Sequence, residues 1–91
     1  MSSVQIFFLY AENCKDCEAA KIAIRDAVAE AGIECDFKMF NSDTRVAINI
    51  AIQNNIDDIP ACVIGSGVKV FQGTAFPKNE IIAAIKKAAT T

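Results

Sequence analysis

Two cysteines with two residues between them form the segment Cys14-Lys15-Asp16-Cys17, and this spacing suits reversible disulfide chemistry. One turn of helix between them would bring the two sulfurs close enough to join without large movement of the backbone. As a structural cross-link, so short a loop contributes only about 2 kcal/mol. The spacing is therefore better explained by thiol–disulfide exchange, in which Cys14 attacks a substrate disulfide and Cys17 then displaces the reduced substrate.

The pair lies between a predicted strand and a predicted helix, a position that favours the ionised form of Cys14. The first N–H groups of a helix have no partner within it, and the helix start carries about half a positive charge. Both effects lower the pKa of a cysteine there below its ordinary value of about 8.5, toward about 7. Three nearby carboxylates oppose them, those of Glu12, Asp16 and Glu18. We therefore expect a modestly lowered pKa and a reducing rather than strongly oxidising pair.

The residues alone leave two other roles open for the pair. Free cysteines are often small buried core residues. Two thiolates can also bind a metal ion, and Cys35 or Cys62 could supply a third, although the chain has no histidine. Core packing is the favoured interpretation for both of these cysteines, but Cys62, two residues after Pro60, could approach Cys14. We expect no bound metal ion and no cofactor.

The composition favours a single folded domain and excludes several partners. Hydrophobic residues make up 53% of the 91 residues, charged residues make up 22%, and the net charge is −2. The nine Lys and Arg residues form no run, so we expect no nucleic-acid partner. The longest apolar run, residues 6–11, is far too short to cross a bilayer, and the uncharged first five residues lack the basic start of a secretory signal. We expect a monomer in the cytoplasm with no membrane contact.

The hydrophobic pattern predicts four strands and three helices in the order βαβαββα. The predicted strands are residues 4–10, 33–39, 61–64 and 68–71, and the predicted helices are 17–31, a segment ending near Asn54, and 77–87. Residues 33–39 alternate apolar and polar side chains, which is typical of a sheet edge. Asn41, Ser42 and Asp43 are the expected caps of the second helix, and Gly65, Ser66 and Gly67 the expected turn between the last two strands.

These elements together predict an α/β fold. The βαβ half requires parallel strands joined by a right-handed crossover, and the hairpin adds antiparallel strands. The expected architecture is a four-stranded mixed sheet with helices on both faces.

The chain resembles the thioredoxin and glutaredoxin superfamily over nearly its whole length. Residues 7–14, Phe-Phe-Leu-Tyr-Ala-Glu-Asn-Cys, followed by Cys17, are similar to the family's first core strand and active-site turn. Residues 55–61, Asn-Ile-Asp-Asp-Ile-Pro-Ala, resemble its Gly-Ile-x-x-x-Pro-Thr segment. Residues 71–73 and 76–78 resemble its last strand and the start of its final helix. The resemblance implies a minimal thioredoxin-like fold of glutaredoxin size.

The resemblance also implies a substrate site around the two cysteines. It implies a cis peptide bond between Ile59 and Pro60, which would direct the backbone N–H and C=O of Ile59 outward. An extended substrate segment could pair with these groups as an added strand. The other candidates for substrate contact are Tyr10, Asn13, Lys15 and Gly73.

The active-site segment departs from the family pattern at several positions. Asn13 stands where thioredoxins carry Trp, and Lys15-Asp16 replaces their Gly-Pro and the Pro-Tyr of glutaredoxins. Phe8 stands where thioredoxins bury an Asp that helps to deprotonate the second cysteine. Ionisation of Cys17 would then depend on water or on Lys15.

Asp57 and Asp58 would repel the carboxylates of glutathione. We therefore expect a dithiol–disulfide oxidoreductase that reduces protein disulfides and is itself reduced by an upstream reductase or a low-molecular-weight thiol. The alternative is a module that carries a metal ion on its thiolates.

Overall fold

The chain alternates strands and helices in the predicted order. The computed structural model describes residues 3–65, 67–74 and 76–90, so Ser66 of the predicted turn lies outside the described residues. The elements are β1 (Val4–Tyr10), α1 (Lys15–Ala31), β2 (Cys35–Asn41), α2 (Arg45–Gln53), β3 (Ala61–Ile64), β4 (Lys69–Gln72) and α3 (Lys78–Ala89).

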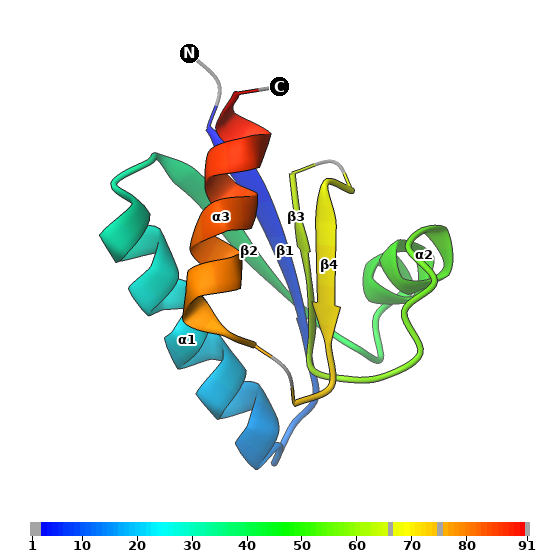
Figure 1. Cartoon of the computed structure of the whole chain (residues 1–91). Coiled ribbons are helices and arrows are strands. Elements are labelled where there is room, and N and C mark those ends of the chain that lie inside the picture. The colour runs from blue at the N-terminus through cyan, green and yellow to red at the C-terminus, as the bar shows by residue number, and fades with distance from the viewer. Residues whose placement is uncertain (1–2, 66, 75, 91) are drawn as a thin grey trace.

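The four strands form one mixed sheet in the order β2-β1-β3-β4. Strand β1 runs parallel to β2 and antiparallel to β3, and β3 runs antiparallel to β4. The carboxyl ends of β1, β2 and β4 therefore meet the beginning of β3 at one end of the sheet (Figure 1, bottom). The segments that follow β1 and β4 and the segment that precedes β3 gather there, and these segments contain the predicted site residues.

Helices cover both faces of the sheet, as predicted. Helices α1 and α3 pack on one face and α2 packs on the other (Figure 1). Successive side chains of a strand point to opposite faces, so β1 contributes Ile6 and Phe8 to the core beneath α1 and α3, and Leu9 to the smaller core beneath α2. This explains why β1 is apolar along most of its length.

Two of the helices are followed by a residue with left-handed backbone geometry. Gly32 ends α1 with φ 66°, and Asn55 follows α2 with φ 56°. Both φ values fall in the left-handed region, which glycine and asparagine tolerate best. Strand β2 lies at the sheet edge, also as predicted.

The helix starts differ from the prediction. Helix α1 begins two residues earlier than expected, with Cys14 as its N-cap. The cap of α2 is Thr44, whose hydroxyl accepts the N–H of Ala47 at 3.3 Å. Asn41, an expected cap, instead accepts the N–H of Asp43 at 2.9 Å within the preceding turn. Residues 41–44 are all of types that can cap a helix, so a helix could begin after any of them. In the structure, the turn geometry places Thr44 at the cap.

No helix within the described part of the chain combines the length and the apolar character needed to span a bilayer.

Candidate functional site

Cys14 and Cys17 are joined by a disulfide at the start of α1. Their Cα atoms are 5.2 Å apart, which is within the ordinary range for a disulfide. Cys14 is the N-cap residue, with extended backbone geometry, and its Sγ accepts the backbone N–H of Cys17 at 3.1 Å. One of the free N–H groups of the helix start is thus directed at the sulfur of Cys14, as the sequence predicts for a stabilised thiolate.

The two cysteines differ in exposure. Cys14 is half-buried. Cys17 is only 5% exposed and packs into the core beneath α1 and α3. An external disulfide can therefore reach Cys14 more readily than Cys17. This asymmetry fits the sequence-based roles of attacking and resolving cysteine.

A cavity of about 570 Å³ lies beside the disulfide, between the start of α1 and the strands β1 and β2. Both cysteines line it, together with Phe8, Tyr10, Ala11, Glu12, Asn13, Glu18, Lys21 and Met39. Tyr10 and Asn13, two of the predicted contact residues, therefore share a cavity with the sulfurs. Lys15, the first residue of α1, is exposed and is not among the described residues that line it.

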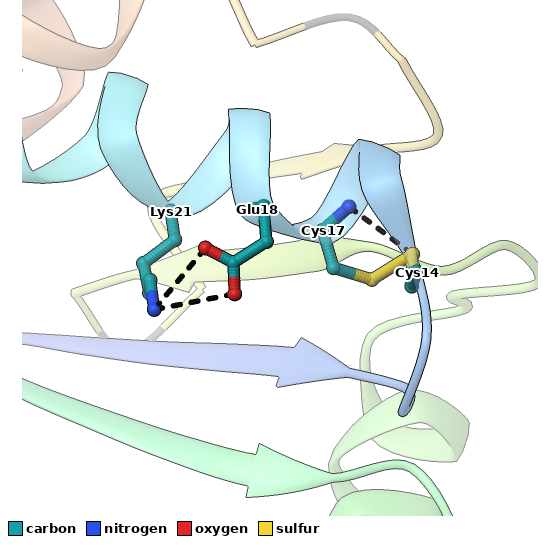
Figure 2. A network of polar contacts seen from close by, with 4 residues as sticks. All are labelled: Cys14, Cys17, Glu18 and Lys21. Atoms are coloured by element: carbon teal, nitrogen blue, oxygen red, sulfur yellow. Dashed lines mark hydrogen bonds and ion pairs between the residues drawn. A yellow bond between two sulfur atoms is a disulfide. The ribbon is translucent and has the colours of Figure 1, made fainter.

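Glu18 and Lys21 were not predicted as site residues, although both lie on the disulfide side of α1. Figure 2 shows their side chains on the same side of the helix as the disulfide, directed toward β1 and β2. The Lys21 Nζ and Glu18 Oε2 atoms are 3.5 Å apart. The Lys21 side chain is 25% exposed and the Glu18 side chain 70% exposed, so the ammonium is the more enclosed charge. Helical spacing alone could have identified Lys21, which follows Cys17 by four residues.

Met39 also lines the cavity, contrary to its expected place on a buried strand face. It is 38% exposed and lies opposite Phe8 in the β1–β2 pairing. Because β2 is an edge strand, the side chain of Met39 keeps solvent contact, and the alternating pattern correctly predicts the strand but overstates the burial of Met39.

Phe8, which the sequence resemblance sets where thioredoxins carry a buried Asp, is fully buried. Its ring lies 6.0 Å from that of Phe37 and 6.4 Å from that of Tyr10, measured between centroids. The position is therefore part of the aromatic core, and it offers no group that could accept a proton from Cys17.

The segment before β3 lies at the same end of the sheet as the disulfide. Leu9 pairs with Ala61, so Pro60 is located beside the end of β1, from which the chain leads to Cys14. The Ile59–Pro60 peptide bond is cis. The N–H of Gly73 donates to the carbonyl of Pro60 at 2.8 Å, which brings this predicted contact residue to the same edge.

The backbone N–H of Ile59 already has an acceptor. It donates to Oδ1 of Asp58 at 3.0 Å, and Asp58 is exposed. The expectation that this N–H points freely outward therefore needs correction, because a substrate segment would have to displace the Asp58 carboxylate.

A separate groove of about 590 Å³ lies between α2 and residues 55–59. Its lining is largely apolar and includes Ile48, Ile52 and Ile59. Ile48 and Ile52 are 48% and 71% exposed, so α2 presents apolar side chains next to the Ile59 segment. The disulfide does not line this groove among the described residues.

Cys35 and Cys62 are not among the described residues that line the cavity beside the disulfide. Cys62 is fully buried opposite Phe8 in β3, and burial raises its pKa to about 12 despite a backbone hydrogen bond at Phe71 that lowers it. Cys35 is half-buried, donates its S–H to the carbonyl of Ile33 at 3.3 Å, and has a pKa raised by burial. Cys62 belongs to the same core cluster as Cys17, and Cys14 packs against that cluster, so the approach of Cys62 to Cys14 stays a prediction. Across residues 3–65, 67–74 and 76–90, no three Cys, Asp or Glu side chains are grouped so as to hold a metal ion.

The fold is that of thioredoxin-like proteins. A solved thioredoxin-like protein from Clostridium perfringens superimposes with a TM-score of 0.76 at 17% identity, covering 94% of this chain and 71% of that one. The oxidised mitochondrial thioredoxin 3 from Saccharomyces cerevisiae gives 0.68 at 17% identity, covering 96% and 80%. The thioredoxin of Fasciola hepatica gives 0.67 at 18% identity, covering 94% and 81%.

No protein-family model matches the chain, and no curated protein sequence matches it. The chain therefore has a thioredoxin-like fold with a disulfide of C-x-x-C spacing, as the sequence predicts.

Proposed function

We propose that this protein is a thiol–disulfide oxidoreductase that reduces protein disulfides through Cys14 and Cys17. The observation that carries the proposal is the difference between the two sulfurs. Cys14 caps α1 and is half-buried, whereas Cys17 is 5% exposed and donates its N–H to the sulfur of Cys14. A structural cross-link needs no such asymmetry, but a reaction in two steps does.

In the first step, the reduced pair attacks the substrate. The Cys14 thiolate attacks one sulfur of the substrate disulfide along the line of the S–S bond. A mixed disulfide forms between Cys14 and the substrate, and the other substrate sulfur leaves as a thiolate that takes a proton from water. The helix start stabilises the attacking thiolate through the N–H of Cys17 and the positive end of the helix dipole.

In the second step, Cys17 releases the substrate. Its thiol loses a proton and attacks the sulfur of Cys14, which re-forms the Cys14–Cys17 disulfide and expels the second substrate thiolate. Two electrons pass from the protein to the substrate in each cycle. A reductase or a low-molecular-weight thiol must then return two electrons to the pair.

Protein disulfides suit the surroundings of the pair better than glutathione does. The Ile59 segment and the apolar groove beside it offer backbone groups and aliphatic side chains to an extended polypeptide. Asp57 and Asp58 are exposed near this edge, and their negative charge disfavours the two carboxylates of glutathione.

Insulin reduction by dithiothreitol tests the proposal. The wild-type chain is expected to accelerate precipitation of the insulin B chain over dithiothreitol alone. Cys14→Ser should abolish the acceleration, and Cys17→Ser should accumulate a mixed disulfide with insulin that mass spectrometry detects. Cys35→Ala is the matched control, because it removes a cysteine outside the pair and should retain the wild-type rate.

Two results would contradict the proposal. One is a wild-type chain that does not exceed the rate with dithiothreitol alone. The other is a Cys14→Ser variant as active as the wild type.

A further inference from the structure

The second step requires ionisation of a sulfur that is almost completely buried. Removal from water disfavours a thiolate, so Cys17 needs a compensating charge or proton acceptor. Phe8 fills the position where a buried carboxylate could act, and Lys15 does not line the cavity among the described residues. Water can accept the proton of Cys17, but a positive charge near the sulfur is needed to favour the buried thiolate.

We propose that Lys21 is a positioning residue that favours the thiolate of Cys17 during release of the substrate, and that Glu18 weakens this effect by pairing with the same ammonium. The inference rests on the proposed function, because it concerns the second step of that reaction. The sulfur of Cys17 would then ionise in the cavity beside the disulfide.

The helix geometry places Lys21 and Cys17 on the same face of α1. Side chains four residues apart on a helix are neighbours on one face, with Cβ atoms about 5–6 Å apart. Cys17 and Lys21 both line the cavity, and the disulfide and the Lys21 side chain lie on the same side of α1 (Figure 2). A flexible four-carbon stem can place the ammonium near the sulfur when a substrate occupies Cys14.

The other charged and titratable groups around the cavity do not replace Lys21. Tyr10 and Glu12 face it from β1 and the segment after it, Glu18 faces it from α1, and β2 contributes the uncharged Met39. Lys21 is therefore the one cation among the described residues that line this cavity. The Lys21 ammonium pairs with Glu18 at 3.5 Å, and this ion pair holds it on this side of the helix. The negative charge of Glu18 also weakens the electrostatic effect of the ammonium on the sulfur of Cys17.

The expected effect is modest and can be estimated. A positive charge within about 4–6 Å lowers the pKa of a thiol by 1–3 units, and solvent contact of the Lys21 side chain favours the lower end of this range. Loss of the charge should reduce the thiolate fraction about tenfold. The remaining thiolate would be about threefold more nucleophilic, because nucleophilicity rises with pKa, so we expect release to slow about threefold at neutral pH.

A two-phase reaction with dithiobisnitrobenzoate measures the second step directly. The reduced wild-type chain should release one nitrothiobenzoate as Cys14 forms a mixed disulfide, and a second one as Cys17 displaces the aryl thiolate and closes the protein disulfide. The rate of the second phase is followed against pH. Lys21→Met should move the midpoint of this profile up by about one pH unit, Lys21→Arg should restore it, and Glu18→Gln should move it down.

Arg25→Met is the matched control, because it removes the same charge one turn further along α1 from a residue that does not line the cavity. The inference is overturned by a Lys21→Met profile that coincides with the wild type or with that of Arg25→Met. It is also overturned by a Glu18→Gln profile that moves upward, which would make the carboxylate the proton acceptor. A wild-type chain that completes both phases but does not reduce insulin would contradict the proposed function. The pH profiles of the Lys21 variants would still test the role of Lys21 separately.

Discussion

The carboxylate of Asp58 accepts the backbone N–H of Ile59 at 3.0 Å, so the residue before Pro60 has its hydrogen-bond donor occupied by its own neighbour. The other oxygen of the same carboxylate lies 3.0 Å from the position that a Cβ atom on Gly73 would take. Asp58 therefore contacts both segments that adjoin the proposed substrate edge. A polypeptide that pairs with Ile59 must first move this side chain.

Replacement of Asp58 by Ala should increase activity on protein disulfides. Removing the competing acceptor frees a hydrogen bond worth on the order of 1 kcal/mol for the substrate, or about a fivefold increase in kcat/KM for insulin. Asp57→Ala is the control, because it removes the same charge from a side chain that does not accept the Ile59 N–H. If the two variants show equal rates, charge rather than the hydrogen bond is responsible and the interpretation of Asp58 is wrong.

Replacement of Gly73 by Ala should destabilise the fold mainly through the backbone. Its φ of 78° lies in the left-handed region, where a Cβ atom costs roughly 1–2 kcal/mol. Gly32→Ala isolates this cost, because its φ is 66° and nothing lies within 4 Å of the added atom. Urea unfolding should show a loss for Gly73→Ala that equals or slightly exceeds that of Gly32→Ala, since the exposed Asp58 carboxylate can move aside. A smaller loss for Gly73→Ala would show that the turn at Gly73 relaxes.

Cys62 should make the oxidised protein sensitive to alkaline pH. Its pKa is 9.0 in the unfolded reference and about 12 in the fold, because burial disfavours the thiolate. Above the unfolded value, the unfolded chain releases a proton that the native chain retains. The contribution of Cys62 to the free energy of unfolding is thus fully present below about pH 9. It is lost by about 1.4 kcal/mol per pH unit as the pH rises toward 12.

Urea unfolding at a series of pH values checks this expectation. The wild-type free energy of unfolding should fall more steeply than that of Cys62→Ala once the pH exceeds about 9. The comparison of slopes cancels the contribution of the lysines and of Tyr10, which both chains share. Parallel slopes would mean that Cys62 ionises in the native protein.

The sequence predicts the frame of the site well because each part of that frame has a local signal. The apolar run of β1, the C-x-x-C spacing and the end of α1 before Gly32 depend on neighbouring residues alone. The cap at Thr44 is less determined, since four consecutive residues from Asn41 could each serve.

The surroundings of the disulfide depend on contacts between elements, which local patterns do not contain. Met39 enters the cavity because β2 pairs with β1 in a register that sets it opposite Phe8. The contact of Asp58 with Ile59 depends on the backbone path before β3. Lys21 is the exception, because its spacing of four residues from Cys17 is a local signal that the sequence contains.

The rate of Cys14 alkylation by iodoacetamide, measured against pH in the reduced chain and assigned by peptide mass, tests the central claim most directly. A sulfur at the helix cap that accepts the N–H of Cys17 should react with a midpoint modestly below the value of about 8.5 for free cysteine, shifted toward about 7. A midpoint of about 8.5 or above would contradict a nucleophilic role for Cys14.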